Sequence, residues 1–347
     1  MNNKLFLPNG YLNFEYIYNI DTPFILIVTG RGCGKTYGAL KFVVENKIKF
    51  LYSRRTQAQA EQVRNPALTP MKKLNKDMHW NYDFAPMSKY IAGLYHSVKD
   101  DKGKFIPQGE PLGYLNALST MVNMRGFDAS DVDVWLFDEF IKEDHERPVK
   151  DEAKAVLNAY ETINRNRELE GRPPLKFIAM ANSNTMNNPL FIYLNLVRKA
   201  TKMKQEGKEI DINRKRGITL IILDESPISE KKKETALYRL TEGTDFIGMA
   251  LNNDFVSDEV GNIISRNLKF YTPLVRVGEI CIYEPKDRER PIYISPHASG
   301  DVDYYPPMKI SLQRFQKDFF WLWGEYMRNR IEFEEYVCEL LFRNYFD

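Results

Sequence analysis

Residues 24–43, FILIVTGRGCGKTYGALKFV, bring together the residue types that proteins use to hold a chain of phosphates. A short apolar run from Phe24 predicts a buried strand, and the apolar spacing after Thr36 predicts a helix. The glycines between them let successive N–H groups point inward, and the helix N-terminus adds partial positive charge. Lys35 can bind the outer phosphates, and the Thr36 hydroxyl can coordinate Mg²⁺. We expect a nucleotide to be held by Thr29, Gly30, Arg31, Gly32, Cys33, Gly34, Lys35 and Thr36.

The spacing departs from the phosphate-loop template G-x-x-x-x-G-K-[ST] at its first position. Thr29 stands there, and a glycine follows one residue later at Gly30. The alternative is an ordinary glycine-rich turn between a strand and a helix. We favour nucleotide binding because the strand and the helix that the motif requires are both predicted.

A second apolar strand, within DVDVWLFDEF at residues 131–140, ends in two carboxylates. Asp138 would hold Mg²⁺ through water opposite Thr36, and Glu139 would polarise the water that attacks the terminal phosphate. A strand that ends in two acids is, by itself, commonly a solvated strand end. Together with the phosphate loop, it predicts an ATPase site.

The stretch MANSNTMNNP, residues 180–189, contains the end of a third apolar strand. An amide at the tip of the strand beside the acidic one can contact the γ-phosphate or position water, and we select Asn182 for this role. Asn and Ser also favour turns for backbone reasons, so a plain turn remains the alternative.

Two other classes of phosphate-loop protein fit the sequence less well. A GTPase would need the guanine signature N-K-x-D late in the domain, and the nearest match, LNKDM at residues 74–78, has its aspartate one place early. Small-molecule kinases rarely carry adjacent Asp and Glu after such a strand.

The whole chain has the composition of a well-packed soluble protein with two domains. It has 347 residues, 43% of them hydrophobic, and a formal net charge of +2, so affinity for nucleic acid must come from local patches. Its three cysteines show no paired spacing, which fits a reducing compartment. No apolar stretch approaches the roughly 20 residues of a membrane span, and the start lacks a signal peptide, so we expect a cytosolic protein without membrane contact.

Strands that alternate with helices predict an α/β fold with a mostly parallel sheet. We further expect a strand at 48–56, a hairpin at 90–109, a helix at 149–171, a strand at 217–224, short strands between 268 and 296, and helices at 311–328 and 332–346. The composition becomes basic from Arg198 to Arg216. We therefore predict a phosphate-loop ATPase domain at 1–200, a basic linker at 201–244 and a smaller C-terminal α/β domain at 245–347.

Five stretches follow one another in an order that resembles a known family. They are TGRGCGKT, YSRR, FDEFI, NRNRE and NSNTMNNPLF, and their order is similar to that in the DNA-packaging ATPases of phi-29-type small tailed bacteriophages. The resemblance covers most of the chain. It implies an additional-strand (ASCE-type) ATPase domain, a small linker and a C-terminal domain resembling an RNase H-type nuclease.

The resemblance also implies an activity, partners and a place of action. It implies a homomeric ring, with five subunits expected, which uses ATP and Mg²⁺ to drive double-stranded DNA through the portal into a prohead in the host cytoplasm. A packaging RNA would be a further partner. Carried over by position, Asp138 and Glu139 are the metal-binding and catalytic acids, and Arg165 matches the arginine that one subunit gives to its neighbour's site.

Helix geometry offers a separate reason to choose Arg165 over Arg167 as that arginine. At about 100° per residue, Arg167 falls within about 20° of Val156, on the apolar stripe of the predicted helix. Arg165 falls about 180° away and faces outward, as a residue that reaches another subunit must. We expect Arg167 to lie along its own domain.

DNA contacts in a packaging motor must be directed at phosphates, because packaging cannot depend on sequence. A solvated charged turn is the alternative for every candidate. The candidates are Arg54, Arg55, Lys102, Lys104 and the basic run 198–216.

Cleavage of DNA by two metal ions needs several carboxylates within a few ångströms of one another. In the C-terminal strands Glu284 lies at an edge, and Asp301 and Asp303 lie in a predicted loop. We therefore expect a docking module without cleavage activity. Two rival hypotheses stay open: a terminase-like motor with an active nuclease, and a nucleotide-gated capsid adaptor with negligible turnover.

Overall fold

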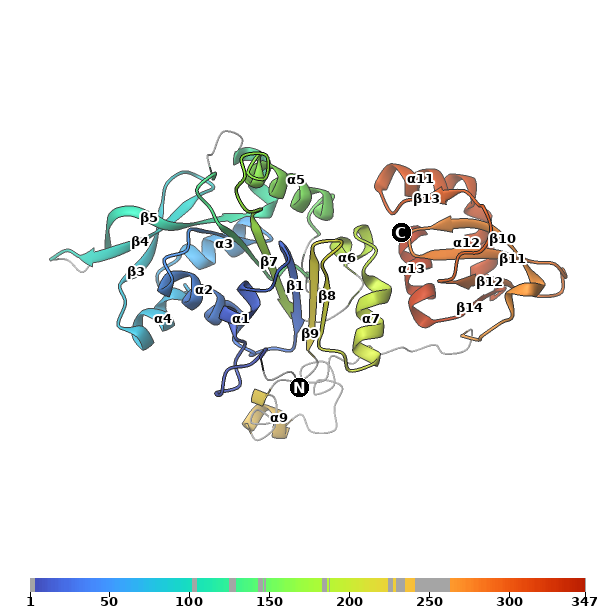
Figure 1. Cartoon of the computed structure of the whole chain (residues 1–347), viewed down its shortest axis with the longest axis horizontal. Coiled ribbons are helices and arrows are strands. Elements are labelled where there is room, and N and C mark those ends of the chain that lie inside the picture. The colour runs from blue at the N-terminus through green and yellow to red at the C-terminus, as the bar shows by residue number, and fades with distance from the viewer. Residues whose placement is uncertain are drawn as a thin grey trace. The chain divides into compact units, whose positions relative to one another are not determined.

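The computed structural model describes residues 4–101, 105–124, 129–142, 146, 148–182, 186, 188–223, 227–228, 235–240 and 263–346. The chain divides into two compact units (Figure 1). The N-terminal unit comprises Met1–Asn184 and Met203–Asp254, and the C-terminal unit comprises Thr185–Lys202 and Phe255–Asp347. Within the described ranges, no helix combines the length and apolar character needed to cross a membrane.

A mixed nine-stranded sheet forms the centre of the N-terminal unit, in the order β3-β4-β5-β2-β6-β7-β1-β9-β8. The strands from β5 to β9 in this order run parallel to one another, and β3, β4 and β8 are added antiparallel at the edges. The expected mostly parallel sheet and the hairpin at 90–109 are therefore confirmed. The strands are β1 (Phe24–Thr29), β2 (Phe50–Arg54), β3 (Tyr82–Pro86), β4 (Ala92–Lys99), β5 (Phe105–Ala117), β6 (Val134–Asp138), β7 (Lys176–Asn182), β8 (Ile210–Asn213) and β9 (Ile218–Leu223).

The order of the central strands decides which side chains can meet. β7 lies between β1, which precedes the phosphate loop, and β6, which ends in the acidic pair. This intervening strand is the feature that defines the additional-strand arrangement. Every residue of β6 and β9 is buried, as expected for parallel strands that are covered on both faces.

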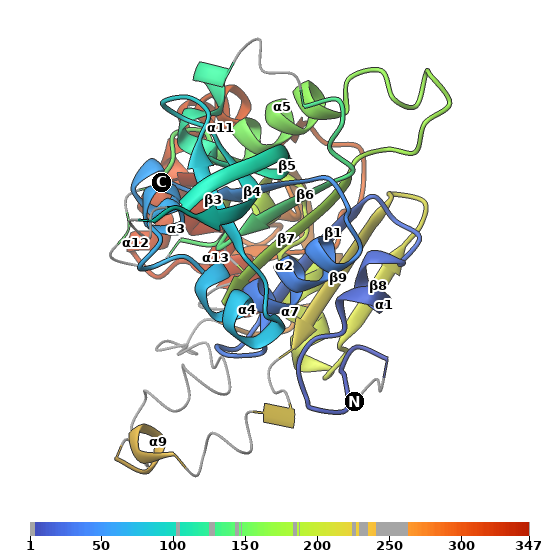
Figure 2. The ribbon, with the colours of Figure 1, turned by 90° about the vertical axis from the view of Figure 1, so that its left-hand side faces the viewer.

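Helices cover both faces of this sheet. One face packs on α1 to α4 through a core that includes Ile25 and Leu136, and Figure 2 shows α2 and α4 in front of the strands. The other face packs on α5, whose Tyr160 ring centroid lies 4.5 Å from that of Phe24. The helical elements of this unit are α1 (Phe14–Tyr18), α2 (Lys35–Glu45), α3 (Gln57–Arg64), α4 (Met71–Met78), η1 (Leu118–Met124), α5 (Glu152–Asn164) and α9 (Ala236–Leu240).

The segment 201–244 is not the basic linker that we expected. Its strands β8 and β9 complete the N-terminal sheet, and β9 pairs with the whole length of β1. The basic residues that suggested a linker lie on α7 (Val197–Gln205), at Lys208 just before the edge strand β8, and on the turn that follows β8. The expected boundary at residue 200 also moves, because α6 (Pro189–Tyr193) belongs to the C-terminal unit.

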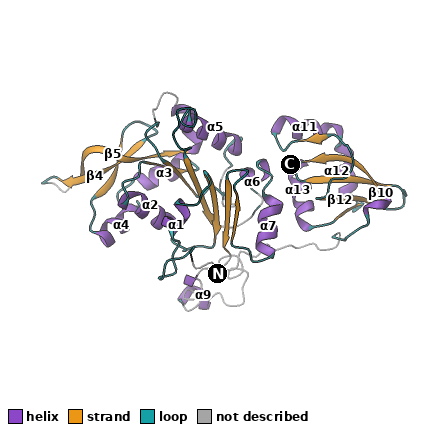
Figure 3. Cartoon of the chain, in the orientation of Figure 1, coloured by secondary structure: helices purple, strands orange, loops and turns teal. Residues whose placement is uncertain are grey.

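The C-terminal unit has a mixed five-stranded sheet in the order β13-β10-β11-β12-β14, accompanied by helices (Figure 3). The expected helix at 311–328 is two helices that separate at Phe319. The expected helix at 332–346 begins later, because Ile331 and Phe333 are buried in a strand that pairs with β12. The elements are η3 (Leu268–Phe270), β10 (Tyr271–Val277), β11 (Ile280–Pro285), β12 (Ile292–Ser295), β13 (Tyr304–Tyr305), α11 (Lys309–Asp318), α12 (Phe320–Met327), β14 (Ile331–Phe333) and α13 (Tyr336–Phe346).

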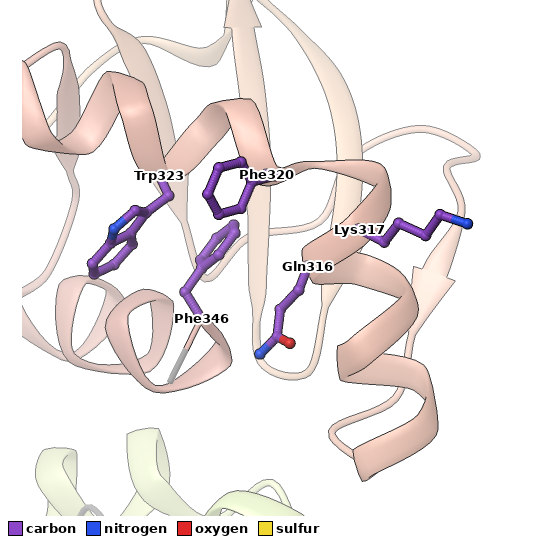
Figure 4. Close-up of a pocket in the computed structure, with 5 residues that line it drawn as sticks. All are labelled: Gln316, Lys317, Phe320, Trp323 and Phe346. Atoms are coloured by element: carbon purple, nitrogen blue, oxygen red, sulfur yellow. The ribbon is translucent and has the colours of Figure 1, made fainter.

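An open pocket of about 490 Å³ lies among the helices of the C-terminal unit (Figure 4). Aromatic rings and polar chain ends line it: Gln316, Lys317, Phe320, Trp323 and Phe346. The acidic residues considered above for DNA cleavage lie elsewhere, on β11 and in the loop before β13, and all of them are exposed: Glu284, Asp301 and Asp303.

Candidate nucleotide-binding site

The predicted phosphate loop lies between β1 and α2, at the carboxyl edge of the N-terminal sheet. Gly32 and Gly34 have φ angles of 84° and 79°, in the left-handed region that favours glycine. Gly34 is also the N-cap of α2, so the N–H groups of the first helical turn face the loop. Thr29, in contrast, is the last residue of β1 and pairs with β7 and β9. An extended backbone needs no glycine, which explains the departure from the template.

Lys35 connects the loop to the neighbouring strand β7. The residue is 8% exposed, and its Nζ donates to Thr29 Oγ1 at 2.7 Å, to the Gly30 carbonyl at 3.1 Å and to Asn182 Oδ1 at 2.9 Å. Asn182 is the last residue of β7 and lies opposite Thr29 in the strand register. The structure thus brings Asn182 to the phosphate loop, which favours a role in the site over a plain turn.

Asp138 is the centre of a buried hydrogen-bond cluster at the end of β6. It is 1% exposed, and its Oδ2 accepts from the hydroxyls of Thr36 and Tyr52, each at 2.7 Å, and from Arg54 Nη1 at 3.2 Å. Burial and then the charge of Asp138 raise the pKa of Tyr52 well above its usual value, so Tyr52 is the donor. The Thr36 hydroxyl and the Asp138 carboxylate are the hard oxygen ligands that Mg²⁺ prefers. These two residues therefore fit the magnesium ion of a bound nucleotide.

Glu139 follows Asp138 in a strained backbone conformation. Its φ is 56°, which residues with a side chain adopt rarely and at a cost of order 1–3 kcal/mol. Its side chain is 40% exposed and pairs with Arg54, whose guanidinium also reaches Asp138. Burial lowers the pKa of Arg54, but Tyr52, Asp138 and Glu139 together raise it above its usual value, so Arg54 stays charged. The strained turn separates the two acids, because Asp138 is buried and Glu139 reaches accessible space.

Arg54 and Arg55 do not fit the DNA-binding role that we expected for them. The Arg54 side chain is 14% exposed and binds both acids of the site. The Arg55 side chain is 0% exposed, and it donates to Glu152 at 2.6 and 2.9 Å and to Glu146 at 2.6 Å. The two arginines are therefore internal ion-pair partners.

The structure describes only some of the other candidate DNA-binding residues. Lys102 and Lys104 lie outside the described residues, so they stay a prediction. In the basic run, Arg198 pairs with Glu335 at 3.3 Å within the C-terminal unit. The turn at 214–216 is exposed.

Arg165 is exposed and Arg167 is buried, as predicted, but the reason is not the helical spacing. α5 ends at Asn164, whose side-chain oxygen accepts the N–H of Leu175 at 2.8 Å, so helical spacing does not extend to either arginine. Arg165 is the C-cap, with a φ of 46°, and is exposed. Arg167 is 3% exposed and donates to backbone carbonyls, including that of Ser130 at 2.9 Å. Its burial and its hydrogen bonds to the backbone suit a structural residue rather than one that reaches another subunit, and burial also lowers its pKa.

Tyr52 and Arg54 belong to the hydrogen-bond cluster around Asp138, although the sequence pattern did not predict that role for either of them. Tyr52 was not singled out, and Arg54 was assigned to DNA. A signal was available, since residues two apart on a strand share a face, so Tyr52 and Arg54 had to point the same way. What the sequence does not display is that β2 lies beside β6, which puts this pair next to Asp138.

The fold and the site together define an α/β phosphate-loop protein with an additional strand and an acidic pair beside the loop. Residues 2–275 of the 347-residue chain match the model of a protein family, the podovirus DNA encapsidation protein (Gp16). Since this match spans more than half of the chain, the protein belongs to that family.

Individual relatives agree with the family assignment. The DNA packaging protein of Bacillus phage B103 is 28% identical over 274 residues, which are 77% of this chain and 74% of the relative. That of Bacillus phage phi29 is 26% identical over 269 residues, which are 74% of this chain and 68% of the relative. A chain of the phi-29 viral genome packaging motor assembly has a similar fold, with a TM-score of 0.59 at 18% identity over 96% of both chains. A chain of the Phi-28 gp11 DNA packaging motor gives a TM-score of 0.59 at 17% identity over 97% of both chains.

Proposed function

We propose that this chain is an ATP-driven motor that moves double-stranded viral DNA into a preformed prohead. The observation that carries the proposal is the meeting of Lys35, Asn182, Thr36 and Asp138 at one edge of the sheet, in a member of the DNA encapsidation family. The relatives from the two Bacillus phages, which are DNA packaging proteins, support the same function.

The position of each residue in the site allows a specific role in the binding or hydrolysis of ATP. The loop N–H groups and Lys35 would bind the β- and γ-phosphates, and Asn182 would contact the γ-phosphate from β7. Glu139 would orient the attacking water and accept its proton. Thr36 and Asp138 would hold Mg²⁺, which neutralises charge on the phosphates when it is bound. Glu139 has the accessibility to meet water, because it is the exposed member of the acidic pair.

The proposed assembly is a homomeric ring at the portal vertex. Arg165 is exposed at the end of α5, which suits a residue that completes the site of a neighbouring subunit. An arginine supplied in this way can accelerate phosphoryl transfer by roughly 10³–10⁵. From the family resemblance we expect five subunits and a packaging RNA as a further partner. The motor would act in the host cytoplasm, on the assembling prohead.

We propose that the C-terminal unit, for which the resemblance implies an RNase H-type fold, docks the motor without cutting DNA. Its candidate acids are exposed on separate segments, and aromatic side chains line its pocket among the helices. Incubation of the full chain with plasmid and Mg²⁺ or Mn²⁺ tests this part of the proposal. Nicked or linear plasmid would favour a motor with an active nuclease.

The central experiment measures phosphate release with and without double-stranded DNA, for the wild type and two variants. DNA should stimulate release by the wild type. Glu139→Gln should bind ATP nearly as well but hydrolyse it roughly 10²–10⁴-fold more slowly, because the carboxylate acts on water and not on the phosphates. Lys35→Ala should instead lose nucleotide binding, measured with a fluorescent analogue. Binding without DNA-stimulated release by the wild type would identify an adaptor and overturn the proposal.

A further inference from the structure

Residues 5–13 form a short hairpin that rests on the phosphate loop. Phe6 and Leu12 form an antiparallel bridge, and the Leu7 N–H donates to the Tyr11 carbonyl at 2.8 Å. The Leu12 N–H then donates to the carbonyl of Cys33, within the loop, at 3.2 Å. Phe6 and Leu12 are buried in the same apolar cluster as Cys33, so the hairpin and the loop share one core in addition to this backbone hydrogen bond.

The side chain of Tyr11, a residue of this hairpin, places its ring against the backbone of Gly34. A Cβ added to Gly34 would lie 2.6 Å from Tyr11 Cδ1, so a side chain at position 34 would collide with the ring. Tyr11 is nevertheless 44% exposed, whereas its neighbour Leu12 is 1% exposed. The hairpin therefore holds a flat and accessible aromatic ring over the N-terminus of α2.

The hairpin lies on the side of β1 that faces away from the acidic strand. β7 and β6 follow on one side of β1, and β9 lies on the other. A Cβ added to Gly10 would lie 3.0 Å from Cβ of Pro227, which comes shortly after β9 in the chain. Figure 2 shows α1 and the start of the chain beside β8 and β9. The terminal phosphate would face β7, where Lys35 meets Asn182, so the nucleoside would leave the loop toward Tyr11.

Tyr37 borders the same end of α2. It is half-buried, and its pKa is raised by burial, by its hydrogen bond to Asp77 and by the charges of neighbours that include Tyr11. Tyr37 lies in the first turn of α2, and its hydroxyl donates to Asp77 at 3.0 Å, so its position at this helix end is fixed.

We propose that Tyr11 stacks on the base of the bound nucleotide and favours a purine nucleoside triphosphate over a bare polyphosphate or a pyrimidine nucleotide. The inference rests on the proposed function, because it takes the phosphate loop as the triphosphate site. Stacking uses the flat face that every base presents, and it strengthens with ring area, so purines gain more than pyrimidines. Tyr11 is thus a specificity-determining residue for the ligand of this loop.

Calorimetric titration of the full chain with ATP, CTP and inorganic tripolyphosphate, each with Mg²⁺, tests the inference. Tyr11→Ala should weaken ATP binding by roughly 5- to 150-fold, weaken CTP binding less, and leave tripolyphosphate binding unchanged. Tyr11→Phe should bind ATP like the wild type, because the ring remains. Tyr11→Leu should behave like Tyr11→Ala, because leucine covers Gly34 without offering a flat ring. Leu7→Ala, in the same hairpin and 41% exposed, is the matched control and should change none of the affinities.

Two results would overturn the inference. Wild-type affinity for ATP in Tyr11→Leu would reduce Tyr11 to a packing residue. Equal losses for ATP and tripolyphosphate in Tyr11→Ala would show that the side chain acts on the shape of the loop. Failure of the proposed function would look different. A wild type that binds both ligands but shows no DNA-stimulated phosphate release would overturn the motor and leave the stacking of Tyr11 intact. A wild type that binds neither ligand, with no change in Lys35→Ala, would remove the phosphate-loop site on which the inference rests.

Discussion

Replacement of Arg55 by methionine tests whether the second arginine of YSRR stabilises the fold or contacts DNA. The guanidinium is 0% exposed and makes three short contacts, to Glu152 at 2.6 and 2.9 Å and to Glu146 at 2.6 Å. Methionine keeps an unbranched apolar side chain of similar length but removes the positive charge from beside two carboxylates. Removal of one partner from a buried ion pair costs about 3–5 kcal/mol.

The two carboxylates contribute unequally to this loss in the free energy of unfolding. Glu152 has a 5% exposed side chain and stays buried beside the lost charge, whereas Glu146, at 20%, can turn toward water. We therefore expect the lower half of the range, about 3–4 kcal/mol. In a unit of this size, each kcal/mol lowers Tm by roughly 2–4 °C, so Arg55→Met should lower Tm by about 6–16 °C.

Thermal unfolding followed by circular dichroism and by calorimetry measures the shift. Arg214→Met is the matched control, because Arg214 has a 70% exposed side chain and lies 3.9 Å from the exposed Asp21, and it should cost less than about 0.5 kcal/mol. The double variant Arg55→Met/Glu152→Gln should recover part of the lost stability, because it removes the stranded charge. An unchanged Tm in Arg55→Met, with weaker DNA binding and a salt slope smaller by about 0.9, would refute the structural role and restore the DNA contact.

Two further predictions concern the assembled motor. Lys35→Ala and Arg165→Ala should each abolish DNA-stimulated hydrolysis. Mixing the two variants should restore part of it, because some subunit interfaces then pair an intact loop with an intact arginine. Normal hydrolysis by Arg165→Ala, together with an inactive Arg167→Ala, would contradict this assignment. Neutralising both Lys102 and Lys104 should reduce the log–log salt dependence of DNA binding by roughly two, about 0.9 per phosphate contact, and an unchanged slope would assign them to a solvated turn.

The strands that carry the site could be predicted because buried parallel strands are continuous apolar runs that end abruptly in polar residues. β1 ends at Thr29, β6 at Asp138 and β7 at Asn182, and the apolar runs before them define all three ends. The glycines and Lys35 between β1 and α2 identify the loop by the backbone angles and the charge that phosphate needs. Local chemistry was sufficient for this part of the fold.

Predictions failed where a side chain in another part of the chain decides the local structure. The helical pattern did not reveal the end of α5, where Arg165 takes a φ of 46° as C-cap and the Asn164 side chain accepts the N–H of Leu175, eleven residues further along the chain. In the C-terminal unit, pairing with β12 makes Ile331 a strand residue, although the local sequence favours a helix. Charge density alone predicted a linker at 201–244, because exposed basic residues precede the buried strand β9.

Arg54 and Arg55 show why tertiary structure is needed to assign neighbouring arginines. They are adjacent in sequence and equal in charge, yet Arg54 is the last residue of β2, Arg55 is the first residue after it, and their side chains meet different acids. Arg54 meets Asp138 and Glu139 at the end of the adjacent strand, whereas Arg55 meets acids that come from the region of α5. The Arg54 cluster forms because β2 lies beside β6, a pairing between residues more than eighty positions apart. The order of the strands therefore determines that one arginine belongs to the candidate site and the other to the stability of the unit that holds it.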